Sequence, residues 1–295
     1  MNVGTWVTSS HWRQDPRRHA LALRKACPQI SEVCLTINDN AHARRAPAWH
    51  IIGDGAAESR RNVKTGLAER WVTRRATDAG RQKARDTLVR AVEAYQDAGF
   101  QTVDLMSWLR PERTFVHHAA EDLHAIFDRA LVNRLHWDCE EAYAHVQGDG
   151  HAATAVELVA AFPDVIQAVT TYAGLLQHPS MSALAGIEKL KSWIVQAYAT
   201  TSSEARPGVV QDYAVREWRK SAAARAGRFM EFGLPAYNQT VSIARVQSEA
   251  VTRHQAAEDL KIRRLCWYWA SSSLKPGAPV PRVLASGGFR DLIAA

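Results

Sequence analysis

The sequence predicts an α/β protein that folds as a (β/α)8 (TIM) barrel with a long excursion after the second strand. Eight short apolar segments alternate with helix-like segments along the 295 residues, and this alternation implies parallel strands joined by right-handed crossovers. Short apolar strands are expected when both faces of a parallel sheet are buried. The main competitor is an open doubly wound sheet, but its Gly-x-Gly-x-x-Gly nucleotide fingerprint is absent. We therefore expect residues 1–295 to form a single barrel domain.

The expected elements alternate from the first strand onward. The strands are predicted at 3–9, 32–37, 101–108, 135–140, 168–172, 193–198, 229–234 and 265–269. The helices are predicted at 16–26, 76–98, 119–131, 152–162, 181–190, 210–226, 242–260 and 289–293. Gly99 is placed to cap one helix and Pro163 to stop another. Residues 41–75 contain Pro47 and several glycines, and we expect them to form the excursion.

Composition excludes several classes of protein. Hydrophobic residues make up 46% of the chain, and no apolar run approaches the ~20 residues that span a bilayer. The four cysteines form no Cys-x-x-Cys pair, so free thiols are expected and no zinc pattern is visible. The phosphate loop and the Gly-x-Ser-x-Gly elbow are also absent. We expect neither a cofactor nor a resident metal.

Positive charge is concentrated in one stretch, residues 41–90, called here the basic segment. The net charge is +7, and this segment holds 12 Lys and Arg against 5 Asp and Glu. Such a segment favours an anionic partner, for example nucleic acid, phospholipid or an acidic cell-wall polymer. The alternative is a solvated helix face together with a loop.

The fourth predicted strand carries the candidate chemistry. Side chains alternate along a strand, so one face presents His136, Asp138 and Glu140. The other face presents Leu135, Trp137 and Cys139. Two carboxylates that crowd each other can raise one pKa and leave a proton donor near neutral pH. The alternative is a strand end that emerges into solvent.

Polar and aromatic residues gather at the carboxyl ends of the predicted strands, where barrels of this kind place their active sites. Aromatic walls with a few carboxylates suit a sugar ring, whose C–H faces stack on aromatic rings. The candidate substrate-binding residues are Trp12, Trp108, Tyr172, Gln196, Tyr198, Tyr237 and Trp269.

Several short motifs resemble glycoside hydrolase barrels. Leu-His-Trp-Asp-Cys-Glu140 is similar to the Asp-x-Glu strand end of the chitinase-like (family 18) and lysozyme-like (family 25) enzymes. Trp-Ile-Val-Gln-Ala-Tyr198 resembles the sixth strand of both families, and Thr-Thr-Tyr172 the fifth strand of family 25. Gly-Leu-Pro-Ala-Tyr237 resembles a turn of family 18, and Trp269 matches its floor tryptophan.

The sequence also departs from both patterns. The first strand has no acid where family 25 has an aspartate, and His136 occupies one place in the aspartate run of family 18. Ala199 stands where family 18 has an acid after the sixth-strand tyrosine. The resemblance therefore implies a divergent relative.

The resemblance implies a glycosidase in which Glu140 is the general acid and Asp138 raises its pKa or orients a substrate acetamide. Asp39 would supply a second carboxylate, or the substrate N-acetyl group would attack while Tyr198 holds it. The implied substrate is a polymer of N-acetyl amino sugars. Cell-wall peptidoglycan fits best, which is the substrate that a phage-type lysin would cleave. The N-terminus has no signal peptide pattern, so we expect cytoplasmic synthesis and action on the wall after lysis or dedicated export.

Three alternatives remain open. The chain could be a non-catalytic carbohydrate-binding barrel, which would tolerate loss of Glu140. It could bind nucleic acid through the basic segment, with steep salt dependence. It could also be a metal-dependent barrel with ligands drawn from Asp39, His136, Asp138 and Glu140.

Overall fold

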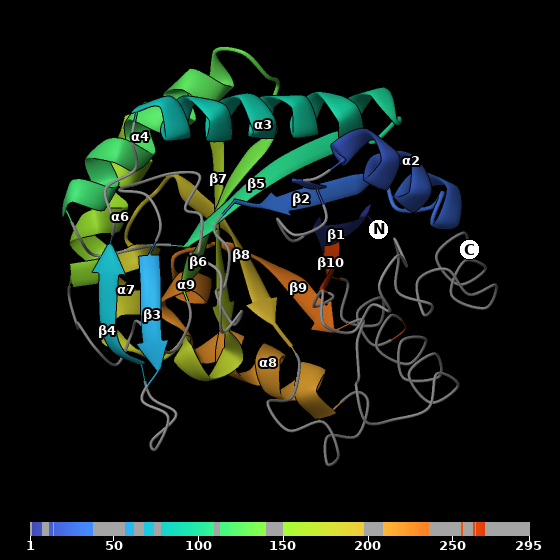
Figure 1. Ribbon diagram of the computed structural model, residues 1–295. Helices are drawn as coiled ribbons and strands as arrows, with labels where there is room; N and C mark the ends of the chain where they lie inside the picture. Colours follow the sequence, from blue (N-terminus) through green and yellow to red (C-terminus); the bar gives the residue numbers. More distant parts are fainter. Residues whose placement is uncertain are drawn as a thin grey trace.

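The computed structural model describes residues 2–7, 12–13, 15–37, 57–61, 68–73, 78–108, 113–139, 150–197, 209–235, 255, 262 and 264–268. Within this part of the chain, eight parallel strands form a closed barrel (Figure 1). They are β1 (Asn2–Val7), β2 (Glu32–Thr36), β5 (Thr102–Trp108), β6 (Arg134–Cys139), β7 (Ile166–Tyr172), β8 (Leu190–Gln196), β9 (Phe229–Pro235) and β10 (Arg264–Tyr268). Strand β1 pairs with both β2 and β10, which closes the ring. The predicted fold class is confirmed.

The two faces of the barrel wall bury different sets of side chains. Five buried residues from five strands form a separate apolar cluster that must lie inside the barrel, namely Trp6, Cys34, Met106, Ala168 and Ile194. Residues of opposite parity, such as Val33, Leu105 and Val169, belong to the larger core cluster under the helices. Alternate residues along each strand face opposite sides of the barrel wall. The residues of the interior cluster therefore identify which positions of each strand face inward.

The described helices pack outside the barrel strands, most of them against the next helix along the chain (Figure 1). They are α2 (Pro16–Ala26), α3 (Asp78–Asp97), α4 (Arg113–Phe127), α6 (Gly150–Ala161), α7 (Pro179–Ala185), α8 (Val209–Lys220) and α9 (Ala222–Arg225), with a short 3-10 turn η1 (Ala173–Leu175). The Asp15 carboxylate caps α2 by accepting from the Arg18 backbone N–H at 3.0 Å. Gly99 follows α3 with φ +87°, as its predicted capping role requires.

Three predicted helix ranges were wrong. The helix expected at 119–131 is α4, which begins soon after Pro111 at Arg113. The helix expected at 181–190 is the short α7, because Leu190 already belongs to β8. The helix expected at 210–226 is divided at Ser221, whose hydroxyl accepts from the Ala224 N–H at 3.1 Å and starts α9. Residues 242–260 lie outside the described part, apart from Gln255, and residues 289–293 lie wholly outside it.

The predicted excursion contains regular structure that the sequence did not indicate. Strands β3 (Ala57–Arg61) and β4 (Ala68–Thr73) pair antiparallel as a separate two-stranded sheet. The pairing places Arg60 opposite Arg70.

None of the described helices is long and apolar enough to cross a membrane.

A charged network occupies the inward positions near the amino ends of the strands. Arg134 donates to both oxygens of the Glu231 carboxylate, at 2.8 and 3.0 Å. Its guanidinium also lies 3.9 Å from Asp104. Asp104 in turn contacts His136, with 2.9 Å between Oδ2 and Nε2. The charge of Arg134 is therefore compensated by the carboxylates of Glu231 and Asp104. A buried charge is tolerated when it is paired in this way.

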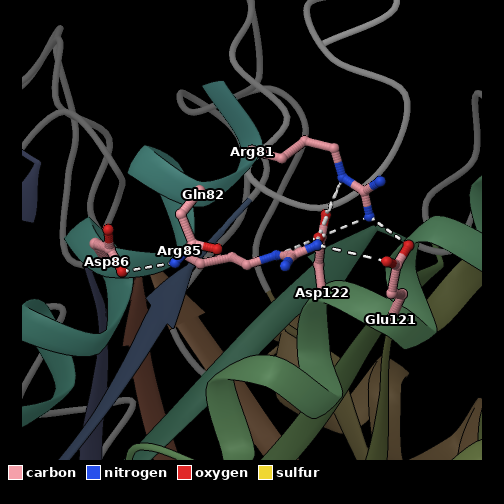
Figure 2. Close-up of polar contacts among 6 residues, drawn as sticks. All are labelled: Arg81, Gln82, Arg85, Asp86, Glu121 and Asp122. Carbon is pink, nitrogen blue, oxygen red and sulfur yellow. Dashed lines mark hydrogen bonds and ion pairs between the residues drawn. The ribbon is translucent and has the colours of Figure 1, made fainter. Parts of the chain in front are cut away.

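A second ionic cluster joins helix α3 to helix α4 (Figure 2). The Asp122 carboxylate is completely buried and accepts from Arg81 at 2.8 Å and from Arg85 at 2.6 Å. Glu121, which is half exposed, accepts from Arg81 at 2.8 Å. Burial acts to lower the pKa of Arg81, but hydrogen bonds to Asp122 and Glu121 outweigh it and raise that pKa above its usual value. The cluster fixes where α4 sits against α3.

The Trp6 ring leaves no room for a side chain at Gly233 on β9. A Cβ at this position would lie 2.5 Å from the Trp6 ring, which is itself buried. We expect Gly233→Ala to destabilise the fold by about 1–3 kcal/mol, because the ring cannot move aside in a filled barrel. Denaturant unfolding checks this, with Gly174→Ala as the control, since a Cβ there meets nothing closer than 3.9 Å. Equal stability of the two variants would contradict the packing described.

Tyr95 on α3 predicts an alkaline limit to stability. Its hydroxyl is buried 2.6 Å from His19 Nδ1, and burial raises its pKa well above the usual value. The unfolded chain ionises above about pH 10 while the native phenol stays protonated, so stability is full below about pH 10 and falls as the pH rises further. Thermal melts from about pH 8 to pH 11 should show a shallower alkaline decline for Tyr95→Phe. Tyr213→Phe, at an exposed tyrosine, should decline like the wild type.

Candidate active site

The carboxyl ends of four consecutive barrel strands are aligned by their hydrogen-bond register. Asp138 on β6 is paired with Trp108 on β5 and with Thr170 on β7. Gln196 on β8 is paired with Tyr172 on β7 and with Gly233 on β9. The structure therefore brings the backbones of four predicted site residues to one edge of the barrel: Trp108, Asp138, Tyr172 and Gln196.

Asp138 lies on the inner face of β6, as the alternation predicted. Its outward neighbours Leu135, Trp137 and Cys139 all belong to the core cluster under the helices. Asp138 is only 3% exposed. Two residues earlier on the same face, His136 is completely buried against Asp104, so the carboxylate lies above a polar interior. Burial of an acid at this end of a barrel is costly unless partners or substrate offset it.

Gln196 is the second predicted residue on the inner face. It lies two residues beyond Ile194, which belongs to the interior cluster, and therefore on the same face of β8. Gln196 is 5% exposed. Its side-chain carbonyl oxygen has no hydrogen-bond partner among the described residues. Tyr172, the adjacent strand end, is half-buried and packs against the outer core cluster.

Trp12 is placed differently from the other candidates. It is completely buried in the core cluster under the helices, and its indole N–H donates to the Thr36 carbonyl at 3.2 Å. As placed, Trp12 packs in the core under the helices and supports the carboxyl end of β2.

The remaining predicted positions are not described. Glu140, Asp39, Tyr198, Tyr237 and Trp269 lie outside the described residues, and Trp108 is described only by its backbone. Their roles stay predictions.

Two inward residues were missed by the sequence reasoning. Thr170 is completely buried, and its hydroxyl has no hydrogen-bond partner in the described part of the chain. It is in register with Asp138 on one side and Ile194 on the other. Trp6 belongs to the interior cluster, and its ring lies against Gly233 on β9. Neither position could be predicted from the local sequence, because both depend on how strands that are distant in the sequence pair with each other.

The described residues give part of the chemistry of the site. No group of three or more His, Cys, Asp and Glu side chains among them is arranged to bind a metal ion. At its carboxyl edge the described inner face presents one carboxylate and two neutral polar side chains, on Asp138, Thr170 and Gln196. Such a site can hydrogen-bond a neutral polar ligand and support proton transfer by a nearby acid.

Comparison with known proteins identifies the fold and no closer relationship. No family model and no curated protein matches the chain. Among solved structures, the catalytic domain of a chitinase from Pyrococcus furiosus is similar with TM-score 0.58 at 12% identity, over 99% of this chain and 95% of that one. A GH18 chitinase from Pseudoalteromonas aurantia has TM-score 0.54 at 12% identity, over 95% and 98%. An endo-1,4-β-D-mannanase from Thermotoga petrophila has TM-score 0.54 at 10% identity, over 99% of both chains.

These neighbours are TIM-barrel glycoside hydrolases. At 10–12% identity the likeness establishes the barrel fold alone, because one fold hosts many chemistries.

Proposed function

We propose that the protein is a glycoside hydrolase that cleaves a polymer of N-acetyl amino sugars, with Glu140 as general acid. The observation that carries the proposal is the position of Asp138, whose buried side chain faces inward at the carboxyl end of β6. Glu140 follows two residues later in the sequence, so continued alternation would give it the same inward direction. This is the end of the barrel where such enzymes carry out their chemistry.

The electrostatic argument concerns this pair of carboxyl groups. A carboxylate held beside Glu140 disfavours its ionised form and so favours a proton donor near neutral pH. Asp39, which follows β2, is the proposed second carboxylate. Alternatively the substrate N-acetyl group acts as the nucleophile, held by Tyr198.

Peptidoglycan is the polymer that this proposal favours. Two of the structural neighbours are chitinases, whose substrate is also built from N-acetyl amino sugars. The basic segment would bind the anionic wall, and a lysin-like role would use an enzyme released by lysis. The mannanase neighbour makes a neutral hexose polymer the natural comparison substrate.

The test is product release from purified substrates. Wild-type protein is incubated with peptidoglycan, chitin oligosaccharides and β-mannan, and new reducing ends are identified by mass spectrometry. The proposal predicts cleavage of the N-acetylated polymers in preference to mannan. A folded wild type that binds these polymers and cleaves none would support the carbohydrate-binding barrel instead.

A further inference from the structure

Two buried polar groups at the carboxyl edge of the barrel are unsatisfied within the described part of the chain. The Thr170 hydroxyl and the Gln196 side-chain carbonyl have no hydrogen-bond partner among the described residues, although the residues are 0% and 5% exposed. Leaving such groups unpaired costs free energy, and native structures rarely tolerate it without a reason. A ligand that completes their hydrogen bonds is one such reason.

Register shows that both groups face the barrel interior. Thr170 is paired with Ile194, and Ala168 lies two residues earlier on its own face; both of these belong to the interior cluster. Gln196 lies two residues beyond Ile194 on the same face of β8. The other partner of Thr170 is Asp138, one strand spacing of roughly 5 Å away.

The chemistry of the two groups restricts the ligand. The Gln196 carbonyl oxygen only accepts, so its partner must donate, whereas the Thr170 hydroxyl can donate to an acceptor. A substituent with one N–H and one C=O would satisfy both. The acetamido group of an N-acetyl amino sugar has this combination.

We propose that Thr170 is a specificity-determining residue, whose hydroxyl donates to the acetamido carbonyl of a sugar seated between Asp138 and Gln196. The inference rests on the proposed function and names the substituent that the site selects. It assigns to Thr170 a contact that the sequence motifs did not suggest.

The chain supplies a matched control at the next residue. Thr171 is also completely buried with an unpartnered hydroxyl in the described part of the chain. Its register partners, Cys139 and Val195, belong to the outer core cluster, so Thr171 faces the helices and not the interior. Replacing either threonine by Val removes an unsatisfied hydroxyl, so both variants should melt at or above the wild-type temperature.

Activity should separate the two variants. On a soluble N-acetylglucosamine tetrasaccharide, Thr170→Val is expected to lose about 10-fold to 100-fold in kcat/KM, the loss typical of one hydrogen bond in a buried site. Thr171→Val should stay within about twofold of the wild type. Thr170→Ser keeps the hydroxyl and should recover most of the activity. Equal activity of the two Val variants, or an equal loss in Thr170→Ser, would overturn the assignment.

A deacetylated tetrasaccharide tests the ligand. The deficit of Thr170→Val should shrink to about twofold on glucosamine chains, because the acetamido group is missing there. An equal deficit on both chains would show that Thr170 contacts another part of the sugar.

Calorimetry separates failure of this inference from failure of the proposed function. A wild type that binds the N-acetylated chain without cleaving it would refute the hydrolase, and weaker binding by Thr170→Val alone would still support the contact. A wild type that neither binds nor cleaves would overturn both.

Discussion

Replacing Glu140 by Gln is expected to lower turnover of an N-acetyl amino-sugar polymer by about 10²–10⁴-fold, the usual worth of general acid–base catalysis. Gln keeps the shape and hydrogen-bonding size of the side chain but cannot give a proton to the leaving glycosidic oxygen. The residue follows the inward-facing Asp138 by two positions, which is why we assign the proton to it. The measurement is release of reducing ends from purified peptidoglycan across pH.

Glu141→Gln is the matched control for this experiment. It makes the same chemical change one residue later, where alternation would direct the side chain to the opposite face. We expect near-wild-type turnover for Glu141→Gln, and unchanged thermal melts for both variants. Near-wild-type hydrolysis by Glu140→Gln would refute the assignment of the acid.

Asp122→Asn is expected to destabilise the protein by about 3 kcal/mol, within the range for breaking a buried ion pair. The carboxylate is completely buried between Arg81 and Arg85 (Figure 2), and its removal leaves two guanidinium groups that are only 11% and 16% exposed. The amide cannot replace the charge, and its N–H₂ group would face other donors.

Glu121→Gln separates burial from simple charge loss. Glu121 precedes Asp122 on α4 and contacts the same arginines, but its side chain is 53% exposed. An exposed ion pair contributes at most about 1 kcal/mol, so this variant should unfold near the wild-type denaturant concentration. If the two variants unfold alike, the buried cluster does not fix α4 as described.

The barrel could be predicted from sequence because its signals are local. Each strand is a short apolar run, and each helix has caps or spacing of its own, such as Pro16 in the first turn of α2 and Gly99 after α3. The hairpin in the excursion could not be predicted in this way. Strand β3 reads Ala-Glu-Ser-Arg-Arg, with no apolar alternation, so its strand conformation depends on pairing with β4.

The candidate site was predictable only in part, for a related reason. The inward direction of Asp138 follows from alternation within one strand, so the sequence was sufficient for it. The position of Thr170 beside Asp138 depends on register between β6 and β7, two strands separated by a helix. Trp12 shows the opposite problem: an aromatic residue after a strand can line a site or pack in the core, and its environment decides which.

The most direct test of the account is a crystal structure of Glu140→Gln with a soluble N-acetylglucosamine oligosaccharide spanning the site. The account predicts that the sugar lies at the carboxyl ends of β6, β7 and β8, with a glycosidic oxygen about 3 Å from the side chain at position 140. The acetamido group of the adjoining sugar should lie between Asp138 and Gln196. An oligosaccharide bound away from these strand ends, or one whose glycosidic bonds lie far from position 140, would contradict the proposed glycosidase site.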